Sequence, residues 1–342
     1  MASIRTINPV ISVCIANYNG EHLITECIQS VLNQSFAQPI EIIVHDDAST
    51  DRSVDLIRNQ FPQVVLIESQ NNVGFCISNN RMAAAAKGEF ILLLNNDAVL
   101  SPNALCCLYD YANQQKIPGI LGLPQYYMET GELIDRSSVF DPFLNPIPNL
   151  DKNRTQVGMV IGACLWIPKT LWQKLGGFPE WFHTLAEDMF ICCYARLCGY
   201  PVEVLTVSGF KHWLGKNLGG GKIVENRLCT TVLRRALSER NKTFTMILCY
   251  PVPVLLVVLP LHLMLLIIEG FLLSLIKRDF RVWREIYWKC LSGIWAHRKI
   301  LKQTRNRIQQ ERQVSVKAFF KPYTLFPHKL RMLWRHGLPE VR

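Results

Sequence analysis

The stretch Phe90–Asp97, FILLLNND, joins an unbroken apolar run to two amides and a carboxylate. A short apolar run of this kind is typical of a strand that is buried on both faces of a sheet. Ser101-Pro102 follows, and this pair suits the N-cap and the first position of a helix. Because ligands in an open α/β sheet bind beyond the carboxyl ends of the strands, Asp97 is a candidate ligand-binding carboxylate. A turn or helix-capping role explains a single Asp equally well.

The flanking sequence alternates apolar runs with amphipathic segments. Strands are predicted at residues 10–16, 40–44, 64–67, 119–125, 158–167, 202–207 and 209–213, and helices at 21–32, 52–60, 74–87, 171–175 and 188–198. This alternation predicts parallel strands that are joined by right-handed crossovers. No GxGxxG or GxxxxGK[ST] motif follows the first strand, so side chains and a metal would have to hold the phosphates of a bound nucleotide. The glycine-rich segment 215–222 is expected to form a mobile flap over a ligand.

Polar residues follow three of the predicted strands directly. They are Asn17-Tyr18-Asn19, Asp46-Asp47 and Asn95-Asn96-Asp97. The carboxyl ends of parallel strands meet at one edge of a sheet, so these clusters are expected to converge there. Carboxylates that are brought together repel one another unless a cation or hydrogen-bond donors offset their charge. The pattern therefore predicts a binding site at this edge.

The basic excess of the chain lies entirely in its last third. Through Arg240 there are 19 Lys and Arg against 22 Asp and Glu, and beyond it 18 against 5, which gives the net charge of +10. A basic region of this kind indicates nucleic acid or an anionic membrane surface as a partner. The sequence contains no nucleic-acid-binding motif, so we expect a membrane surface and no nucleic acid.

One long segment, residues 246–276, carries Glu269 as its only formal charge. It is long enough to cross a bilayer once, although Pro251, Pro253 and Pro260 argue against one straight helix. Lys and Arg flank both of its ends, and positive charge marks the cytoplasmic side of a membrane. The segment is therefore predicted to re-enter the membrane or to lie in its plane. A single membrane span and a buried helix of a homodimer are the alternatives.

The 12 cysteines have neither the spacing of a disulfide framework nor that of a zinc site. The first residues lack the apolar stretch of a signal peptide. Both features favour a cytosolic setting with reduced, mostly buried thiols.

These motifs occur in the same order in a known protein family. Between Val10 and about Lys222, the sequence resembles inverting family 2 glycosyltransferases of the GT-A fold, most closely their bacterial rhamnosyltransferase-like branch. The matching segments are NYN (17–19), HDDASTD (45–51), NVGF (72–75) with Asn80, LNND (94–97), GGF (176–178) and the pair Glu187-Asp188. Two segments depart from the family pattern: Asn95 replaces the first Asp of the DxD motif, and the stretch 182–186 is less aromatic than usual.

The resemblance implies an α/β fold of the Rossmann-like GT-A type. This fold is a mixed, mainly parallel sheet flanked by helices, and here it would be followed by a C-terminal helical, membrane-associated extension. The glycosyltransferase domain is expected at 1–225, with a donor half at about 1–125 and an acceptor half at about 126–225, and the basic, hydrophobic region at 226–342. The residues expected to bind the donor nucleotide are Ala16, Asn17, Tyr18, Asp46, Asp47, Asn80 and Asn96.

A metal site is implied as well. Asp97, Asn95 and His212 are expected to hold Mg²⁺ or Mn²⁺, which would stabilise the charge that develops on the pyrophosphate leaving group of a sugar nucleotide. An ordinary structural histidine explains His212 equally well. Lys216 and Lys222, on the glycine-rich flap, are expected to face the phosphates.

The resemblance also implies a role for two neighbouring acids at the acceptor-binding part of the site. Asp188 is the predicted general base, which would take the proton of the attacking hydroxyl, and Glu187 is expected to orient it. Both acids begin a predicted helix, and the N-terminus of a helix lowers the pKa of a carboxyl. Asp188 is therefore expected to be ionised at neutral pH, although acids also favour this position for purely structural reasons.

The predicted function is metal-dependent transfer of a sugar, with inversion, from a dTDP- or UDP-sugar to a lipid-linked or cell-envelope glycan. Rhamnose is the sugar that the branch implies. The expected location is the cytoplasmic face of the inner or plasma membrane, as a peripheral or monotopic protein. The alternative is a catalytically weak sugar-nucleotide-binding or scaffold protein of a polysaccharide assembly complex, which Asn95 favours. A nucleotidyltransferase is disfavoured, because no basic glycine-rich loop follows the first strand.

Overall fold

The structure, a computed structural model, describes residues 8–213, 220–224, 227–337 and 340–341. These residues form two compact units. The first unit contains the described part of Met1–Ser137, together with Asn149–His183 and Tyr200–Trp213. The second unit contains Ser138–Pro148, Thr184–Gly199 and the described part of Leu214–Arg342. The domain boundary expected near residue 225 stays a prediction.

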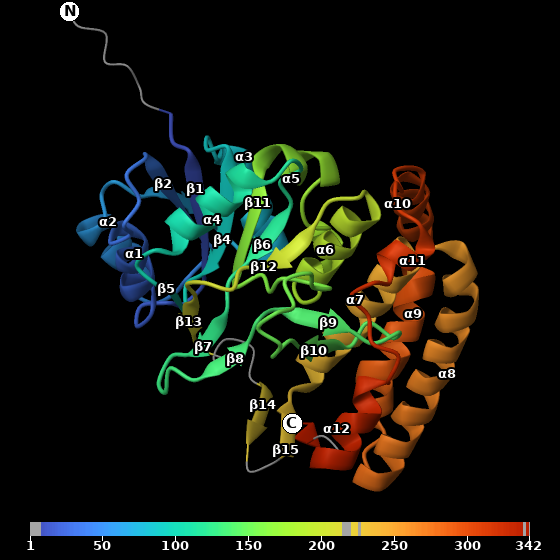
Figure 1. The fold of residues 1–342 in the computed structure, drawn as a ribbon. Coiled ribbons are helices and arrows are strands. Elements are labelled where there is room, and N and C mark those ends of the chain that lie inside the picture. The colour runs from blue at the N-terminus through green and yellow to red at the C-terminus, as the bar shows by residue number, and fades with distance from the viewer. Residues whose placement is uncertain (1–7, 214–219, 225–226, 338–339, 342) are drawn as a thin grey trace, which may run out of the picture. The chain divides into compact units, whose positions relative to one another are not determined.

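A seven-stranded sheet is the framework of the first unit (Figure 1). Its strand order is β12-β6-β11-β4-β1-β2-β3. Strands β4, β1, β2 and β3 are parallel, as are β12 and β6, whereas β11 is antiparallel to both of its neighbours. The predicted mixed, mainly parallel sheet is thus confirmed. Its strands are β1 (Ile11–Asn17), β2 (Ile40–Asp46), β3 (Val65–Glu68), β4 (Phe90–Asn95), β6 (Ile120–Gly122), β11 (Cys164–Pro168) and β12 (Val202–Val204).

Strand β4 lies in the middle of this sheet because its side chains are apolar on both faces. Leu92 joins a core cluster with α1 and α4, and Ile91, which alternates to the other face, is equally buried. Phe90 stacks on Trp166 of β11, with ring centroids 4.8 Å apart. The helices of this unit are α1 (Ile24–Leu32), α2 (Ser53–Gln60), α3 (Phe75–Ala85), α4 (Ala104–Gln114), α5 (Lys169–Leu175) and the short η1 (Glu180–Phe182).

A second, four-stranded sheet continues from the end of β4. Its order is β5-β13-β7-β8, from β5 (Ala98–Leu100), β13 (Phe210–His212), β7 (Gln125–Tyr127) and β8 (Leu133–Asp135). The strand predicted at 119–125 is therefore wrong as one element, because Pro124, which has no N–H to donate, separates β6 from β7. The strand predicted at 158–167 is shorter, since a turn at 162–163 precedes β11.

The second unit is mainly helical. Helix α7 packs against five other helices of this unit, α6, α8, α9, α10 and η2. The helices are α6 (Glu187–Leu197), α7 (Val232–Cys249), α8 (Val252–Lys277), the π-helical η2 (Trp283–Trp288), α9 (Lys289–Ala296), α10 (Arg298–Gln310), α11 (Val316–Phe319) and α12 (His328–His336). The strands are β9 (Ser138–Phe140), β10 (Pro146–Pro148), β14 (Gly220–Val224), β15 (Arg227–Thr230) and β16 (Glu340–Val341).

The apolar segment 246–276 contains the last turn of α7, a break at Tyr250 and Pro251, and α8, a continuous helix of 26 residues. The expectation that the prolines rule out one straight helix through this segment is borne out at Pro251, which separates α7 from α8, whereas Pro253 and Pro260 do not interrupt α8. Pro251 lies at the N-cap and Pro253 in the first turn, where helical N–H groups have no partner within the helix. Pro260 is accommodated inside the helix. Among the described residues, α8 is the one helix long and apolar enough to cross a membrane, by length and composition alone.

The central strand yields a stability prediction. Leu92→Ala removes a fully buried side chain from the core cluster of the first unit, and such cavities cost about 2–5 kcal/mol. Urea unfolding should show a loss of this size. The control is Val65→Ala on the edge strand β3, where the side chain is exposed and the loss should stay below about 1 kcal/mol. Equal losses for the two variants would contradict the central position of β4.

Candidate active site

The carboxyl ends of β1, β2 and β4 lie side by side in the sheet. Asn17 of β1 is level with Asp46 of β2, and Ala16 of β1 is level with Asn95 of β4. The predicted convergence of the polar strand ends is therefore observed. The polar groups of this edge lie at the positions where parallel sheets bind ligands.

Asn17 links the three strand ends through its buried amide. Its Nδ2 donates to Asp46 Oδ1 at 2.8 Å and to Ser53 Oγ at 3.0 Å, and its Oδ1 accepts from Asn96 Nδ2 at 2.9 Å. Gly20 packs against this arrangement, because a Cβ at that position would lie 2.2 Å from Asn17 Oδ1. Asn17 and Asn96 thus hold the shape of the edge with their side chains.

The two acids of the HDDASTD segment are held by hydrogen-bond donors. Asp46 accepts from the backbone N–H of Ser49 at 2.9 Å and from its hydroxyl at 2.6 Å. Asp47 accepts from the N–H groups of Val73 and Gly74, at 2.7 and 2.9 Å, one with each carboxylate oxygen. These donors offset the negative charge of the acids, so Asp47 fastens the NVGF segment to the end of β2.

Two further residues of the predicted nucleotide site have different surroundings: Tyr18 is exposed, and Asn80 is hydrogen-bonded to the backbone. The Tyr18 side chain is 48% exposed next to these strand ends, so its ring is open to a ligand. Asn80 makes a reciprocal pair of bonds with the backbone of Phe178, each at 2.9 Å. It therefore fixes the GGF turn, where a Cβ on Gly177 would lie 2.5 Å from Asn80 Oδ1.

Asp97 and His212 form a buried pair. Asp97 directly precedes β5, and β5 pairs with β13 so that Ala98 is level with His212. His212 Nε2 lies 3.0 Å from Asp97 Oδ1, and His212 Nδ1 lies 2.7 Å from Gln125 Nε2. If Nδ1 accepts from the Gln125 amide, Nε2 carries the ring proton and donates it to Asp97. Gln125 and this contact were missed from the sequence, because strand pairing alone brings the three residues together.

The surroundings of this pair bear on metal binding. Asn95 Oδ1 is buried and has no hydrogen-bond partner among the described residues. Desolvation raises the pKa of Asp135 to about 6, and His212 opposes this shift. Within the described ranges, no group of three or more His, Cys, Asp or Glu side chains could hold a metal ion. The candidate metal donors are thus an Asp97 oxygen, the Asn95 carbonyl oxygen and His212 Nε2, and Nε2 can bind a metal only in the other tautomer, in which Nδ1 carries the proton and donates it to the Gln125 carbonyl oxygen.

The two predicted phosphate-facing lysines are not placed by the structure. Lys216 lies outside the described residues. Lys222 lies in β14 by its backbone, and its side chain is outside the described part of the chain. Their role stays a prediction.

Glu187 and Asp188 belong to the second unit, where they begin α6. Both side chains are buried. The preceding residues Leu185 and Ala186 have φ values of +70° and +63°, which non-glycine residues rarely adopt. Such strain persists only where the surroundings fix it, and it is frequent at functional sites. The backbone thus holds the acid pair in a set orientation.

Burial, rather than the helix terminus, controls the ionisation of Glu187. Desolvation and the neighbouring Asp188 raise its pKa, its own backbone N–H and Arg234 of α7 oppose the shift, and the resulting pKa is about 8. Glu187 Oε2 has no hydrogen-bond partner among the described residues. Burial therefore favours the protonated form of Glu187, contrary to the simple expectation for an acid at a helix N-terminus.

Asn241 of α7 holds the strained segment and was missed from the sequence. Its side chain is fully buried, and Nδ2 donates to the carbonyl oxygens of Thr184 and Leu185, at 2.9 and 2.8 Å. These bonds fix the two residues that lead into Ala186 and the acid pair. The signal in the sequence was the polar run Glu239–Thr243, placed directly before the apolar tail.

Comparison with known proteins shows which family the first part of the chain is similar to. Residues 12–176 match the family described as Glycosyl transferase family 2. One relative is the poly(ribitol-phosphate) beta-glucosyltransferase of Bacillus spizizenii, which is 34% identical over 148 residues, 38% of this chain and 23% of that protein. The matched part spans 23% to 40% of the length of the first three curated relatives.

Solved structures show a similar fold. Staphylococcus aureus TarS, residues 1–349, superposes with a TM-score of 0.52 at 14% identity and covers 88% of this chain and 90% of that one. GalNAc-T7, solved with UDP, GalNAc and Mn²⁺, superposes with a TM-score of 0.56 at 15% identity and covers 70% of this chain and 48% of that one. The fold is therefore GT-A-like, with a mixed, mostly parallel sheet and a C-terminal helical region with one apolar helix.

The raised pKa of Glu187 predicts a pH-dependent stability. The folded chain keeps a proton that the unfolded chain releases above its ordinary pKa of 4.5, so the free energy of unfolding should fall as the pH rises from about 4.5 to about 8. Glu187→Gln, which stays neutral, removes this decline. Its melting temperature should therefore exceed that of the unmodified chain at about pH 8.5, and the difference should shrink at about pH 5.

The exposed Glu180 provides the matched control. Glu180→Gln should leave the pH dependence of the melting temperature unchanged. A pH dependence that is identical in the unmodified chain and in Glu187→Gln would show that Glu187 is ionised in the folded protein.

Proposed function

We propose that the chain transfers a sugar, with inversion, from a nucleotide-sugar to a glycan or lipid-linked acceptor of the cell envelope, because residues 12–176 match the family described as Glycosyl transferase family 2. The observation that carries the proposal is the polar edge of the sheet, where Asn17, Asp46 and Asn96 are joined and Asp97 is paired with His212. The donor is a UDP- or dTDP-sugar, and rhamnose is the sugar that the resemblance of the branch implies.

The nucleotide is proposed to bind at this edge. The exposed ring of Tyr18 offers a stacking surface for the base. Asp46 accepts three close hydrogen bonds and has acceptor capacity left for an N–H of uracil or thymine. The proposed nucleotide-binding residues are Ala16, Asn17, Tyr18, Asp46, Asp47, Asn80 and Asn96, and for Asn17, Asn80 and Asn96 the role is to shape the site.

Mg²⁺ or Mn²⁺ is the proposed cofactor. Asp97 and His212 would hold it with an oxygen and a nitrogen, which suits Mn²⁺ in particular, and Asn95 Oδ1 is an unused carbonyl oxygen in a buried position. The bound ion would supply positive charge where the pyrophosphate leaving group becomes more negative. The Mn²⁺ in the GalNAc-T7 structure supports this choice only through the similar fold.

Asp188 is proposed as the general base. The acceptor oxygen forms a bond to the anomeric carbon, the bond from that carbon to the phosphate oxygen breaks with its electrons going to the nucleotide, and the hydroxyl proton passes to Asp188. Glu187, neutral at pH 7, orients the acceptor or its partner acid as a hydrogen-bond donor. The positive charge of Arg234 interacts favourably with a negative charge on either acid.

The proposed place of action is the cytoplasmic face of the membrane, with the chain as a peripheral or monotopic protein. The apolar helix α8 and the basic C-terminal region support this location. A lipid-linked or cell-envelope acceptor agrees with the name of the poly(ribitol-phosphate) relative. A homodimer that covers α8 is the alternative for that surface.

The donor site is tested by calorimetric titration with UDP and dTDP, each with and without Mn²⁺. Mn²⁺ should tighten binding of at least one nucleotide, and Asp97→Ala should abolish this gain, which we expect to be roughly 10- to 100-fold. The exposed Asp110 of α4 is the matched control, and Asp110→Ala should keep the gain. Failure of both nucleotides to bind under every condition would favour the scaffold alternative.

Asn241 is predicted to position the base. Asn241→Ala removes both bonds to the strained segment, so transfer should slow by roughly tenfold or more, mainly in kcat, while calorimetric nucleotide affinity is retained. Asp188→Asn should lower transfer by roughly 10²- to 10⁴-fold with the same retained affinity.

Thr245→Val is the matched control, since Thr245 lies buried on the same helix and its hydroxyl has no hydrogen-bond partner among the described residues. It should leave kcat unchanged. If Asn241→Ala weakens nucleotide affinity or leaves kcat intact, Asn241 has no positioning role.

A further inference from the structure

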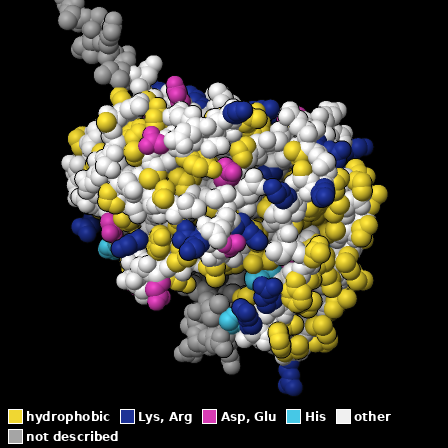
Figure 2. All heavy atoms as spheres, in the orientation of Figure 1, with side chains coloured by type: hydrophobic (Ala, Val, Ile, Leu, Met, Phe, Trp, Pro, Cys, Tyr) yellow, Lys and Arg dark blue, Asp and Glu magenta, His cyan; other side chains and the backbone are white. Residues whose placement is uncertain are grey.

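Helix α8 buries polar side chains and exposes apolar ones, the opposite of what is expected for a surface helix in water. Its buried positions include the polar residues His262 and Ser274, on one face with Leu266, Gly270 and Leu273. Its exposed face is aliphatic and aromatic. The exposed residues are Val252, Leu256, Val257, Leu261, Met264, Leu265, Ile267, Ile268, Phe271, Leu272, Leu275 and Ile276, of which Leu256 and Leu275 are 70% and 72% exposed. Figure 2 shows apolar side chains gathered over this helix.

The inner face of α8 is held by close packing. A Cβ on Gly270 would lie 2.6 Å from the rings of both Trp283 and Tyr287, so η2 approaches the helix as closely as a glycine allows. His262 Nε2 lies 2.9 Å from Thr243 Oγ1 of α7. The helix therefore has a defined inner side, and its apolar side is a stable surface rather than a consequence of loose packing.

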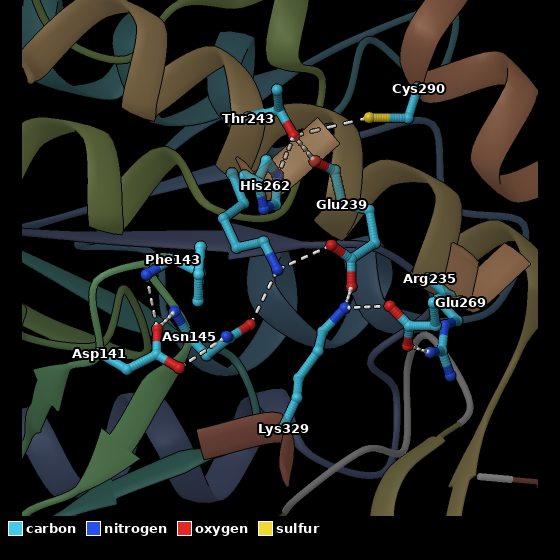
Figure 3. Close-up of polar contacts among 11 residues, drawn as sticks. Asp141, Phe143, Asn145, Arg235, Glu239, Thr243, His262, Glu269, Cys290 and Lys329 are labelled. Atoms are coloured by element: carbon cyan, nitrogen blue, oxygen red, sulfur yellow. Dashed lines mark hydrogen bonds and ion pairs between the residues drawn. The ribbon is translucent and has the colours of Figure 1, made fainter. Parts of the chain in front are cut away.

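An ion-pair network fastens the same face (Figure 3). Glu269 of α8 pairs with Arg235 of α7 at 2.5 Å and with Lys329 of α12 at 2.8 Å. Lys329 also pairs with Glu239 at 2.6 Å, and Glu239 pairs with Lys242 at 2.7 Å. Lys242, Lys329 and Arg235 together hold the pKa of Glu239 well below its ordinary value. Because breaking such a pair leaves a buried charge without a partner, α8 cannot leave this face at low cost.

Helix α12 extends the apolar surface. Lys329 joins it to the network, while Leu330, Leu333 and Trp334 of the same helix are exposed, Trp334 to 90%. Leu325 and Phe326, just before the helix, are exposed as well. The exposed apolar residues of α8 and α12 thus belong to two helices that one lysine connects.

Positive charge accompanies this surface. Beyond Arg240 the chain has 18 Lys and Arg against 5 Asp and Glu. Exposed cations follow α8 in sequence and continue through α12; among them are Arg278, Arg281, Lys289, Lys299, Lys302, Arg331 and Arg335. Exposed Trp288 and Trp295 lie between them in the sequence. Lys, Arg and Trp next to an apolar face are typical of helices that lie in the interface of an anionic membrane.

We propose that the exposed faces of α8 and α12 form one surface that docks into an anionic lipid bilayer, with α8 lying in the membrane plane. The proposal rests on the membrane association in the proposed function and adds its surface and geometry. A spanning α8 would have lipid around it, whereas its inner side carries Glu269 and His262 in contact with the polar residues of α7. Burial of those partners in hydrocarbon would be costly, so only the outer side enters the bilayer.

Vesicle flotation of the full chain tests the docking surface. The unmodified chain should float with vesicles of phosphatidylcholine and phosphatidylglycerol, and less with phosphatidylcholine alone or at high salt. Leu256→Glu combined with Leu275→Glu should weaken partition into the mixed vesicles by roughly tenfold or more. Leu330→Glu combined with Trp334→Glu, on α12, is an independent test and should act in the same direction.

The matched control combines Val65→Glu and Ile117→Glu, two exposed apolar residues of the first unit. It should float like the unmodified chain. The proposal would be overturned if the α8 variant and the α12 variant both float as well as the unmodified chain. So would an unmodified chain that forms a dimer, fails to float, and becomes a monomer in the α8 variant, because that result makes a second copy the occupant.

The orientation of α8 is tested with a membrane-impermeant maleimide added outside preformed vesicles. Cys106, which is partly exposed in the first unit, reports the side before α8, and Lys302→Cys on α10 reports the side after it. Labelling of both thiols, located by mass spectrometry, is expected for a helix in the membrane plane. Protection of the second thiol alone would show that α8 spans the bilayer.

These outcomes are separable from those of the proposed function. Nucleotide binding and donor hydrolysis in detergent-free solution test the donor site, and vesicle binding tests the surface. A chain that floats without binding a nucleotide would contradict the proposed function and leave the docking surface standing.

Discussion

The polar edge of the seven-stranded sheet depends on the buried side-chain amide of Asn17. Parallel strands bring polar groups together at one edge, and buried polar groups are costly unless each finds a partner. Asn17 provides these partners, because it donates to Asp46 and Ser53 and accepts from Asn96. The strand ends therefore keep their positions before any ligand binds, so the residues beside them, Tyr18 and Asp97, project from a rigid frame.

Helix α7 has the corresponding role in the second unit. Asn241 holds the strained backbone before the acid pair, Arg234 acts on the charges of these acids, and Glu239 and Lys242 belong to the network that fastens α8. A single helix thus carries the residues that set the acid pair and those that fix the apolar surface. Polar residues are unusual in a helix that packs against five others. In α7 they are the residues that make the hydrogen bonds and ion pairs just described.

The sequence predicted most of the sheet, since unbroken apolar runs and the polar residues that end them are local signals. It also predicted the convergence of Asn17, Asp46 and Asn95. The pair of Asp97 with His212 and Gln125 depends on strand pairing between distant segments, which no local pattern encodes. The break at Pro251 agrees with the sequence, but the continuity of α8 past Pro253 and Pro260 was missed because proline rules are statistical: Pro253 lies in the first turn, where a helix tolerates it, and Pro260 is accommodated inside. The raised pKa of Glu187 was missed because burial depends on tertiary packing.

The division of residues between the two units has a consequence for the proposed reaction. The groups proposed for the nucleotide and metal, such as Asp46 and Asp97, belong to the unit built on the sheet, and a nucleotide-sugar arrives from water. The proposed base Asp188 belongs to the unit that carries α8, and a lipid-linked acceptor, as proposed, would arrive through the membrane. Under the two proposals, each substrate would be handled by the unit whose surface suits the phase that it comes from. A bilayer that holds α8 would then concentrate a lipid-linked acceptor near the unit that carries Asp188, while the sheet would bind a donor from water.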